Sequence, residues 1–303
     1  MSGDLPVRGV FCAAATPVAA DLSPDLQLFA AHCRQLISDG VTGIALLGTT
    51  GEANSFDLGE RRAILEAALD GGIAPDRLMP GTGVAAVPDS VALTRHALSV
   101  GVNRVVMLPP YYYKGVSDDG LFDAYRTIID RIADDRLQVV LYHIPQVSGV
   151  PLSLDLIGRL VAAYPKTVVG IKDSSGDFEN MRRIVETFAG FSVFAGADPL
   201  MMPLLKIGGA GCITAASNLM STDLRTVFDG HADPSRADAV AAAQRRVETL
   251  RSLSNRYPQI ATIKAMIAWR TGEAGWTRVR PPLRPLDEAQ RADIDSEMAK
   301  AAG

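Results

Sequence analysis

The sequence predicts a (β/α)8 barrel followed by a helical extension at the C-terminus. Short apolar runs alternate with longer helical patterns through about the first 230 residues. Apolar runs of this kind are typical of parallel strands covered on both faces, and eight of them indicate a closed barrel. An open doubly wound sheet is the alternative, but no glycine-rich dinucleotide turn follows the first run. The eight runs are GVFCAAATPV from Gly9, GIALLG from Gly43, RLMPGTG from Arg77, RVVMLPP from Arg104, QVVLYHIP from Gln138, TVVGIKDS from Thr167, FSVFAGA from Phe191 and AGCITAA from Ala210.

Helices are expected between these strands. Residues 24–38 carry apolar side chains at helical spacing between Leu26 and Ile37. Residues 153–163 repeat the pattern and begin at Ser153, whose hydroxyl is a good N-cap because it can accept a free amide of the first turn.

The chain beyond residue 230 reads as helical only. Pro234 and Pro258 suit the first turns of two helices, and Gly272 suits a C-terminal cap. A last helix is expected at about 287–301. The predicted division is a barrel that holds the active site, residues 1–230, and a helical part packed on it, residues 231–303.

Composition excludes several classes of protein. The chain has 303 residues, and its 30 basic and 34 acidic side chains leave a net charge of −4 without a basic patch. Nucleic acid and anionic membranes are therefore not expected as partners. No apolar run reaches the roughly 18 residues of a membrane span, and no signal peptide is apparent, so a cytoplasmic protein is expected. Scattered cysteines and histidines predict neither a disulfide framework nor a metal site.

The side chains at the carboxyl ends of the strands carry the functional argument, because barrel active sites lie there. Lys172 ends the apolar run TVVGI and is followed at once by polar residues. A lysine usually lies in a surface loop. At the rim of a packed barrel, however, an amine is partly dehydrated, and its neutral form can attack a ketone to give an imine. A protonated imine accepts electrons from a neighbouring carbon, which is the chemistry of a class I aldolase.

Two further groups could complete such a site. Tyr142 ends the adjacent strand and could move protons, although a packing tyrosine is the simpler reading. Thr49 and Thr50 follow the second strand between two glycines, and the amides of such a turn can hold a carboxylate. An ordinary tight turn is the alternative there.

The remaining strand ends have weaker readings. Asp198 either caps the next helix or binds substrate. His143 follows Tyr142 in a strand, so it points to the opposite face and is expected to be structural. Rim aromatics account for the tyrosines at 111–113.

Together these residues resemble the N-acetylneuraminate lyase and dihydrodipicolinate synthase family. The similarity covers residues 9–286 and is carried by GTTGE, PPYYYKG, YHIPQVSG, GIKDSSGD and GGAGCITAASN in this order. The resemblance implies a homotetramer built as a dimer of dimers, with no cofactor besides a lysine imine. It implies Lys172 as the Schiff-base lysine and Tyr142 as the proton relay, with Tyr112 as a further catalytic residue that enters the neighbouring subunit's site. The implied substrate-binding set is Thr49, Thr50, Gly51, Ser174, Asp198 and Ile213, of which Thr50 also supports catalysis.

Two departures from the family bear on the substrate. Val147 stands where dihydrodipicolinate synthases carry an arginine that binds the second substrate's carboxylate, which disfavours aspartate semialdehyde. Pro199 stands where sialic-acid lyases carry a second acid, which disfavours sialic acid. The motifs PPYYYKG, IKDSSG and AGAD are closest to aldolases for 2-keto-3-deoxy sugar acids, and hydroxy-oxoglutarate aldolases share some of them.

The sequence therefore predicts a Schiff-base lyase that joins or separates pyruvate and an aldehyde, most similar to enzymes of 2-keto-3-deoxy sugar acids or hydroxy-oxo acids. Dihydrodipicolinate synthase, a 2-keto-3-deoxy acid dehydratase and N-acetylneuraminate lyase remain alternatives. A non-catalytic 2-oxo acid binding protein is the alternative from another class, since a fold does not determine a function.

Overall fold

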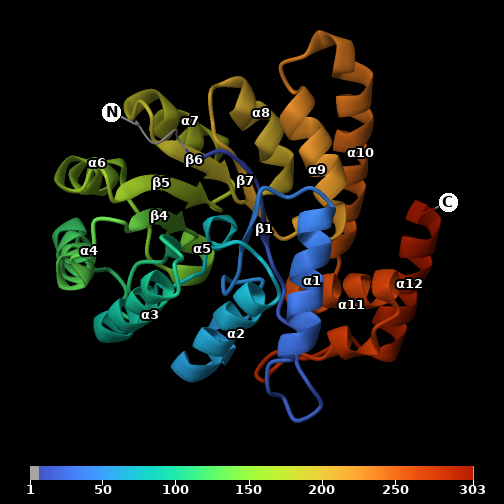
Figure 1. Cartoon of the computed structure of the whole chain (residues 1–303). Helices are drawn as coiled ribbons and strands as arrows, with labels where there is room; N and C mark the ends of the chain where they lie inside the picture. Colours follow the sequence, from blue (N-terminus) through green and yellow to red (C-terminus); the bar gives the residue numbers. More distant parts are fainter. Residues whose placement is uncertain (1–6, 303) are drawn as a thin grey trace.

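A computed structural model describes residues 7–302, and it contains a parallel sheet that closes into a barrel (Figure 1). Part of the N-terminal stretch on which the absence of a signal peptide was predicted lies outside these residues. The seven strands run in the order β2-β1-β7-β6-β5-β4-β3. They are β1 (Gly9–Ala13), β2 (Gly43–Ala45), β3 (Arg104–Met107), β4 (Gln138–His143), β5 (Val168–Asp173), β6 (Ser192–Ala195) and β7 (Gly211–Thr214).

The predicted strand RLMPGTG from Arg77, third in chain order, is present only as two single-residue bridges that close the barrel between β2 and β3. Leu78 pairs with Ile44, and Gly81 pairs with Val106. Pro80 lies between them and has no amide hydrogen, so this segment cannot form a full ladder; its carbonyl still accepts from the Val106 amide at 2.9 Å. The predicted barrel is confirmed, and the open sheet is excluded.

Helices surround the barrel and cover its outer face (Figure 1). The predicted helix at 24–38 begins at Leu26, capped by Asp25, and the helix after Ser153 is confirmed with that residue as its N-cap. The helices around the barrel are α1 (Leu26–Ser38), α2 (Leu58–Asp70), α3 (Val87–Ser99), α4 (Asp118–Ile132), α5 (Pro145–Ser148), α6 (Leu154–Ala163), α7 (Phe178–Thr187), α8 (Met201–Lys206) and α9 (Ser217–Gly230).

The C-terminal part consists of α10 (Ala237–Ser254), α11 (Gln259–Thr271) and α12 (Glu288–Ala302). Pro234 lies in a short 3-10 turn before α10, and Gly272 ends α11 in the left-handed conformation, as predicted. Side chains of α11 share a buried cluster with Ala15, two residues after β1, and with Ala215, which directly follows β7. This part therefore packs beside the carboxyl edge of the barrel. The boundary at residue 230 stays a prediction.

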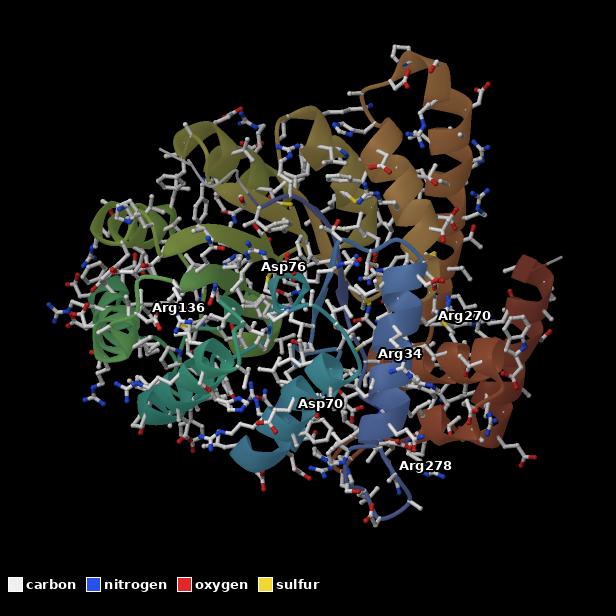
Figure 2. The ribbon with its side chains drawn as sticks, in the orientation of Figure 1. Arg34, Asp70, Asp76, Arg136, Arg270 and Arg278 are labelled. Carbon is white, nitrogen blue, oxygen red and sulfur yellow. The ribbon has the colours of Figure 1, made fainter. Side chains whose placement is uncertain are left out.

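Two arginines of this C-terminal part, Arg270 and Arg278, are labelled in Figure 2, and they contact α9 and the loops on either side of α1. Arg270 lies 3.7 Å from the Asp39 carboxylate and donates to the Leu219 carbonyl, and Arg278 donates to the Val18 carbonyl at 3.2 Å. None of the helices in residues 7–302 is long and apolar enough to cross a membrane.

The barrel has two apolar layers, as the two-residue period of its strands requires. Val139 and Leu141 of β4 face the helices, whereas Val140 and Tyr142 face the barrel interior. In β5, Ile171 faces the helices. The alternation therefore assigns its neighbour Lys172 to the inside of the barrel.

Asn218 joins three elements beneath the C-terminal part. Its side-chain oxygen accepts from the Ala15 amide and contacts His32 Nε2 at 2.9 Å, while its amide nitrogen donates to the carbonyls of Ala13 and Ala215. Every hydrogen-bonding position of the Asn218 amide group is thereby used, which offsets its burial. Burial lowers the pKa of His32 to about 4.

This His32 pKa predicts a loss of stability in acid. The unfolded chain binds a proton at His32 near pH 6.5, whereas the folded chain does so only near pH 4, so stability falls as the pH drops between these values. The contribution is on the order of 3 kcal/mol. Urea unfolding at pH 7 and pH 4 should show less acid sensitivity in His32→Gln, which can still donate to Asn218. Parallel losses in both proteins would contradict this.

Candidate active site

Lys172 and Tyr142 lie next to each other inside the barrel mouth. They are register partners on the paired strands β5 and β4, and only 5% and 4% of their surfaces are exposed. The lysine Nζ lies 4.3 Å from the centre of the tyrosine ring. The tyrosine hydroxyl lies 3.2 Å from Thr49 Oγ1. The amine thus lies against the face of the phenol ring, and the phenol hydroxyl contacts the threonine hydroxyl.

The local sequence explains why Lys172 is held in place. Gly170 precedes it by two residues, and a Cβ there would lie 2.5 Å from the Ser192 carbonyl oxygen, so only glycine allows β5 and β6 to approach this closely. Asp173 follows it and is fully buried. Its carboxylate accepts from the Ser175 amide and hydroxyl and from the Asn180 side chain. The backbone is therefore fixed on both sides of Lys172, at Gly170 and at Asp173.

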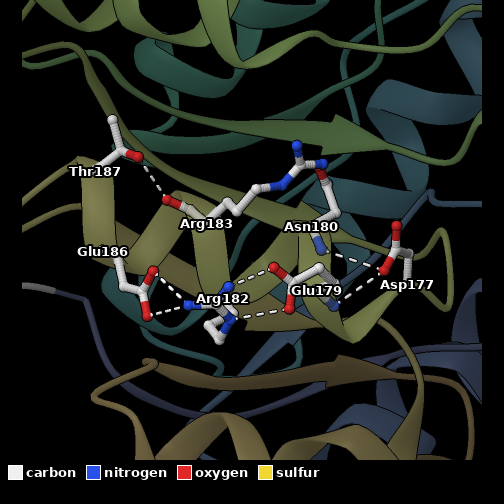
Figure 3. Close-up of polar contacts among 7 residues, drawn as sticks. All are labelled: Asp177, Glu179, Asn180, Arg182, Arg183, Glu186 and Thr187. Carbon is white, nitrogen blue, oxygen red and sulfur yellow. Dashed lines mark hydrogen bonds and ion pairs between the residues drawn. The ribbon is translucent and has the colours of Figure 1, made fainter.

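Helix α7 continues this fixed segment (Figure 3). The Asp177 carboxylate accepts from the amides of Glu179 and Asn180 and caps the helix. Arg182 bridges Glu179 and Glu186 on the exposed face. The cap supports the loop after Lys172, whereas exposed pairs like those of Arg182 stabilise the helix only slightly.

The turn that follows β2 carries Thr49 and Thr50. Two non-glycine residues bracket it in the left-handed conformation, Leu47 at φ 57° and Glu52 at φ 53°. Each such residue costs of order 1–3 kcal/mol and is found where the surroundings fix the backbone. Within residues 7–302, the main-chain amides of Thr49 and Thr50 donate to no protein oxygen. They are therefore free to bind an anion.

A cavity of about 340 Å³ opens above these groups. Lys172, Tyr142 and Thr49 line it, together with Tyr111 and Val147. The Tyr111 hydroxyl donates to Asn54 at 2.9 Å, and burial raises the pKa of Tyr111. A cavity of this size is at the lower end of the range for small-molecule sites.

The other predicted site residues lie outside this lining. Tyr112 is 74% exposed and packs edge-on against Tyr113, and Ser174 lies half-buried after β5. Ile213 is buried in the barrel interior. Thr50 and Gly51 belong to the turn but not to the cavity wall.

Asp198 has no exposed surface in this chain. Its Oδ2 lies 3.3 Å from Arg251 Nη1, and burial raises the pKa of its carboxyl group. Its Oδ1 has no partner among the described residues. Arg251 comes from α10, far along the chain, so the sequence carried no sign of this contact.

His143 faces away from Tyr142, in agreement with the two-residue period. Its Nδ1 accepts from the Leu152 amide at 3.1 Å, and burial lowers its pKa. No cluster of three histidine, cysteine, aspartate or glutamate side chains in the described part of the chain could hold a metal ion.

Sequence reasoning missed one charged residue beside the turn. Lys264 of α11 contacts the Glu52 carboxylate, and neither side chain is exposed. The only sign in the sequence is a lysine within the apolar stretch IATIKAMIAW, because a charge buried in such a helix needs a partner.

A buried amine and phenol at the carboxyl edge of a parallel barrel fit a lyase of the class I aldolase type, and comparison with known proteins shows this class. Residues 6–301 match the model of the dihydrodipicolinate synthetase family. The chain therefore belongs to this family, and the predicted family and enzyme class are confirmed.

Similar proteins extend over nearly the whole chain. An uncharacterized DapA-like lyase of Chloroflexus aurantiacus is 35% identical over 95% of this chain and 94% of its own length. The crystal structure of dihydrodipicolinate synthase from Agrobacterium tumefaciens is 31% identical, with a TM-score of 0.88 and coverage of 96% of this chain and 99% of that one. YagE of E. coli, a member of the dihydrodipicolinic acid synthase family solved in complex with pyruvate, is 26% identical, with a TM-score of 0.89 and coverage of 97% and 98%.

The crowded turn predicts a contrast between two glycine substitutions. A Cβ at Gly51 would lie 2.8 Å from the Ala14 carbonyl oxygen, whereas a Cβ at Gly48 would meet nothing within 4 Å. Gly51→Ala should therefore lower the free energy of unfolding by about 1–3 kcal/mol, with little loss for Gly48→Ala. Urea denaturation measures both, and equal midpoints for the two variants would argue against a fixed turn.

Proposed function

We propose that the protein is a Schiff-base aldolase that cleaves or forms the bond between pyruvate and an aldehyde, with Lys172 as the amine. The single observation that carries this proposal is the grouping of buried Lys172 and Tyr142 with Thr49, whose main-chain amide, like that of Thr50, has no protein partner. Covalent attachment to lysine needs no metal or organic cofactor.

The first step is imine formation. The neutral Lys172 amine attacks the 2-keto carbon to give a carbinolamine. The carbinolamine hydroxyl then takes up a proton delivered through Tyr142 and leaves as water, which gives a protonated imine. The amides of Thr49 and Thr50 bind the neighbouring carboxylate, with Gly51 part of the same turn. Fixing the carboxylate orients the carbonyl carbon toward the amine, which lowers the entropic cost of attack.

Carbon–carbon cleavage follows from the imine. Tyr142 takes the proton of the C4 hydroxyl and passes its own toward the Thr49 hydroxyl, with which it is in contact. The C3–C4 bond then breaks, its electron pair moves into the imine, and the aldehyde leaves. The remaining enamine takes a proton at C3, and water releases pyruvate and the free lysine. In the direction of synthesis the same steps run backward.

The second half of the substrate is proposed from the sequence motifs, which favour a 2-keto-3-deoxy sugar acid or a hydroxy-oxo acid. Charged side chains along the described cavity wall are limited to Lys172 and Glu52, and Val147, which also lines the wall, is 62% exposed. This lack of a guanidinium supports the argument against aspartate semialdehyde. Ser174 and Asp198 are proposed to bind substrate hydroxyls, which requires Asp198 to become accessible.

The assembly and location of the enzyme stay predictions. A homotetramer would bring Tyr112, which is highly exposed in a single chain, to a neighbouring subunit's site. Ile213 would contribute to the base of the pyruvate pocket, and the protein would act in the cytoplasm. The imine could also support dehydration, so a dehydratase on the same 2-oxo acids is the second candidate.

Trapping with borohydride tests the covalent step. Incubation with pyruvate and borohydride should reduce the imine to a stable amine, and mass spectrometry should find one pyruvate-derived adduct per chain at Lys172. Lys172→Ala should give none and should lose at least about 10³-fold in activity, because the nucleophile is gone. An adduct that survives in Lys172→Ala would contradict the mechanism.

The phenol of Tyr142 can be tested apart from the amine. Tyr142→Phe keeps the ring against Lys172 but removes the hydroxyl, so kcat should fall by about 10²–10⁴-fold. The borohydride adduct should still form at long incubation. Pyruvate release from a panel of 2-oxo acids, coupled to lactate dehydrogenase, measures kcat and identifies the substrate class. Unchanged kcat in Tyr142→Phe would remove this residue from the relay.

A further inference from the structure

A fully buried ion pair joins the C-terminal helices to the carboxylate-binding turn. Lys264 Nζ of α11 lies 2.5 Å from Glu52 Oε1, and the side chains of both residues are 0% exposed. They are 212 positions apart in the sequence. The second carboxylate oxygen of Glu52 accepts from the Arg280 main-chain amide at 3.2 Å. Both oxygens of Glu52 are therefore held by the C-terminal part of the chain.

The backbone of Glu52 has an unusual conformation that this pair can explain. Glu52 is left-handed at φ 53° and ψ 33°, and its amide donates to the Thr49 carbonyl at 3.1 Å. A glycine would adopt this conformation without strain, so a glutamate here suggests that its carboxylate is needed at this position. Glu52 follows Thr49 by only three residues and Thr50 by two.

Stability alone does not explain such a pair. Removing two charges from water costs about as much as their attraction returns, so a buried ion pair is often no more stabilising than apolar residues of the same size. What such a pair does provide is a fixed geometry, because either charge left unpaired would be strongly unfavourable. Burial lowers the pKa of Lys264, while the Glu52 charge opposes this.

The pair also lies where it can act on the site. Glu52 lines the cavity that contains Lys172, and Ile260, one turn before Lys264 on α11, lines it too. On the opposite side of the turn, the Thr16 hydroxyl donates to the Gly51 carbonyl at 2.9 Å. The turn is therefore held from the barrel side by Thr16 and from the helical side by Lys264.

We propose that Glu52 and Lys264 are positioning residues, whose ion pair holds the Thr49–Thr50 turn so that its two free amides converge on the carboxylate of the 2-oxo acid. The inference rests on the proposed function, since it assigns the turn to that carboxylate. It gives the C-terminal helices a role in substrate binding as well as in packing. Neither residue touches the reacting carbon.

The test is the pyruvate concentration that gives half-maximal borohydride trapping. Lys264→Met, and the double variant Glu52→Gln/Lys264→Met, should raise this concentration at least tenfold. Both should still reach a full adduct at saturating pyruvate, because Lys172 is intact. The double variant leaves no unpaired charge buried, so it should fold even where the single variant does not.

A matched control separates positioning from general stability. Ile263→Ala removes buried side-chain volume from the same helix, one residue from Lys264, in an apolar cluster with Ala15, Ala215 and Trp276. It should lower the melting temperature and leave the half-saturating concentration of pyruvate within twofold of the unmodified protein. Glu52→Asp keeps both charges but shortens the tether by one methylene. Glu52→Asp should raise the half-saturating concentration of pyruvate. If both proteins with Lys264→Met fail to fold, this variant alone tests the positioning role.

The possible results are distinguishable. A trapped adduct in the unmodified protein, with half-saturation unchanged in the folded variants, would overturn the positioning role and leave the proposed function in place. A shift as large in Ile263→Ala would likewise overturn it. Failure of the unmodified protein to trap pyruvate would overturn the proposed function and this inference with it.

Discussion

The pairing of β4 with β5 is the constraint on which the site depends. Its register sets Tyr142 opposite Lys172, and the two-residue period turns both side chains into the barrel. A shift of this register by one residue would leave the phenol opposite a residue of the outer face. Gly170 allows β6 to approach β5 closely, and buried Asp173 fixes the chain just beyond the lysine. The position of the Lys172 amine relative to Tyr142 is therefore fixed by the backbone hydrogen bonds that pair β4 with β5.

The proposed mechanism also requires a rigid turn that binds the substrate carboxylate, and contacts from the barrel side and from α11 hold this turn. Two left-handed residues, Leu47 and Glu52, bend the backbone so that the amides of Thr49 and Thr50 are left without protein partners. Strain of this kind persists only where other contacts enforce it. The contacts come from Thr16 on β1's side and Lys264 on α11's side. The helical extension and the barrel are in this sense parts of one site.

Much of the fold could be predicted from the sequence, because apolar periodicity reports directly on buried strands. It located all eight barrel segments and placed Lys172 and Tyr142 at adjacent strand ends. The proline within RLMPGTG was a sign that this strand would be weakened, because Pro80 has no amide hydrogen to donate, but the two bridges that remain could not be located from it. Nor could apolar periodicity show that Lys264 pairs with Glu52, or that Asp198 is buried against Arg251. These contacts join segments far apart in the chain, and no local pattern records them.

A crystal structure of the protein soaked in pyruvate tests the central claim most directly. The account predicts continuous electron density between Lys172 Nζ and C2 of pyruvate, with the carboxylate within hydrogen-bonding distance of the Thr49 and Thr50 amides. It also predicts the Tyr142 hydroxyl next to the carbon that would receive the aldehyde. Pyruvate bound without a covalent bond, attached to another lysine, or with its carboxylate away from the turn would contradict the account.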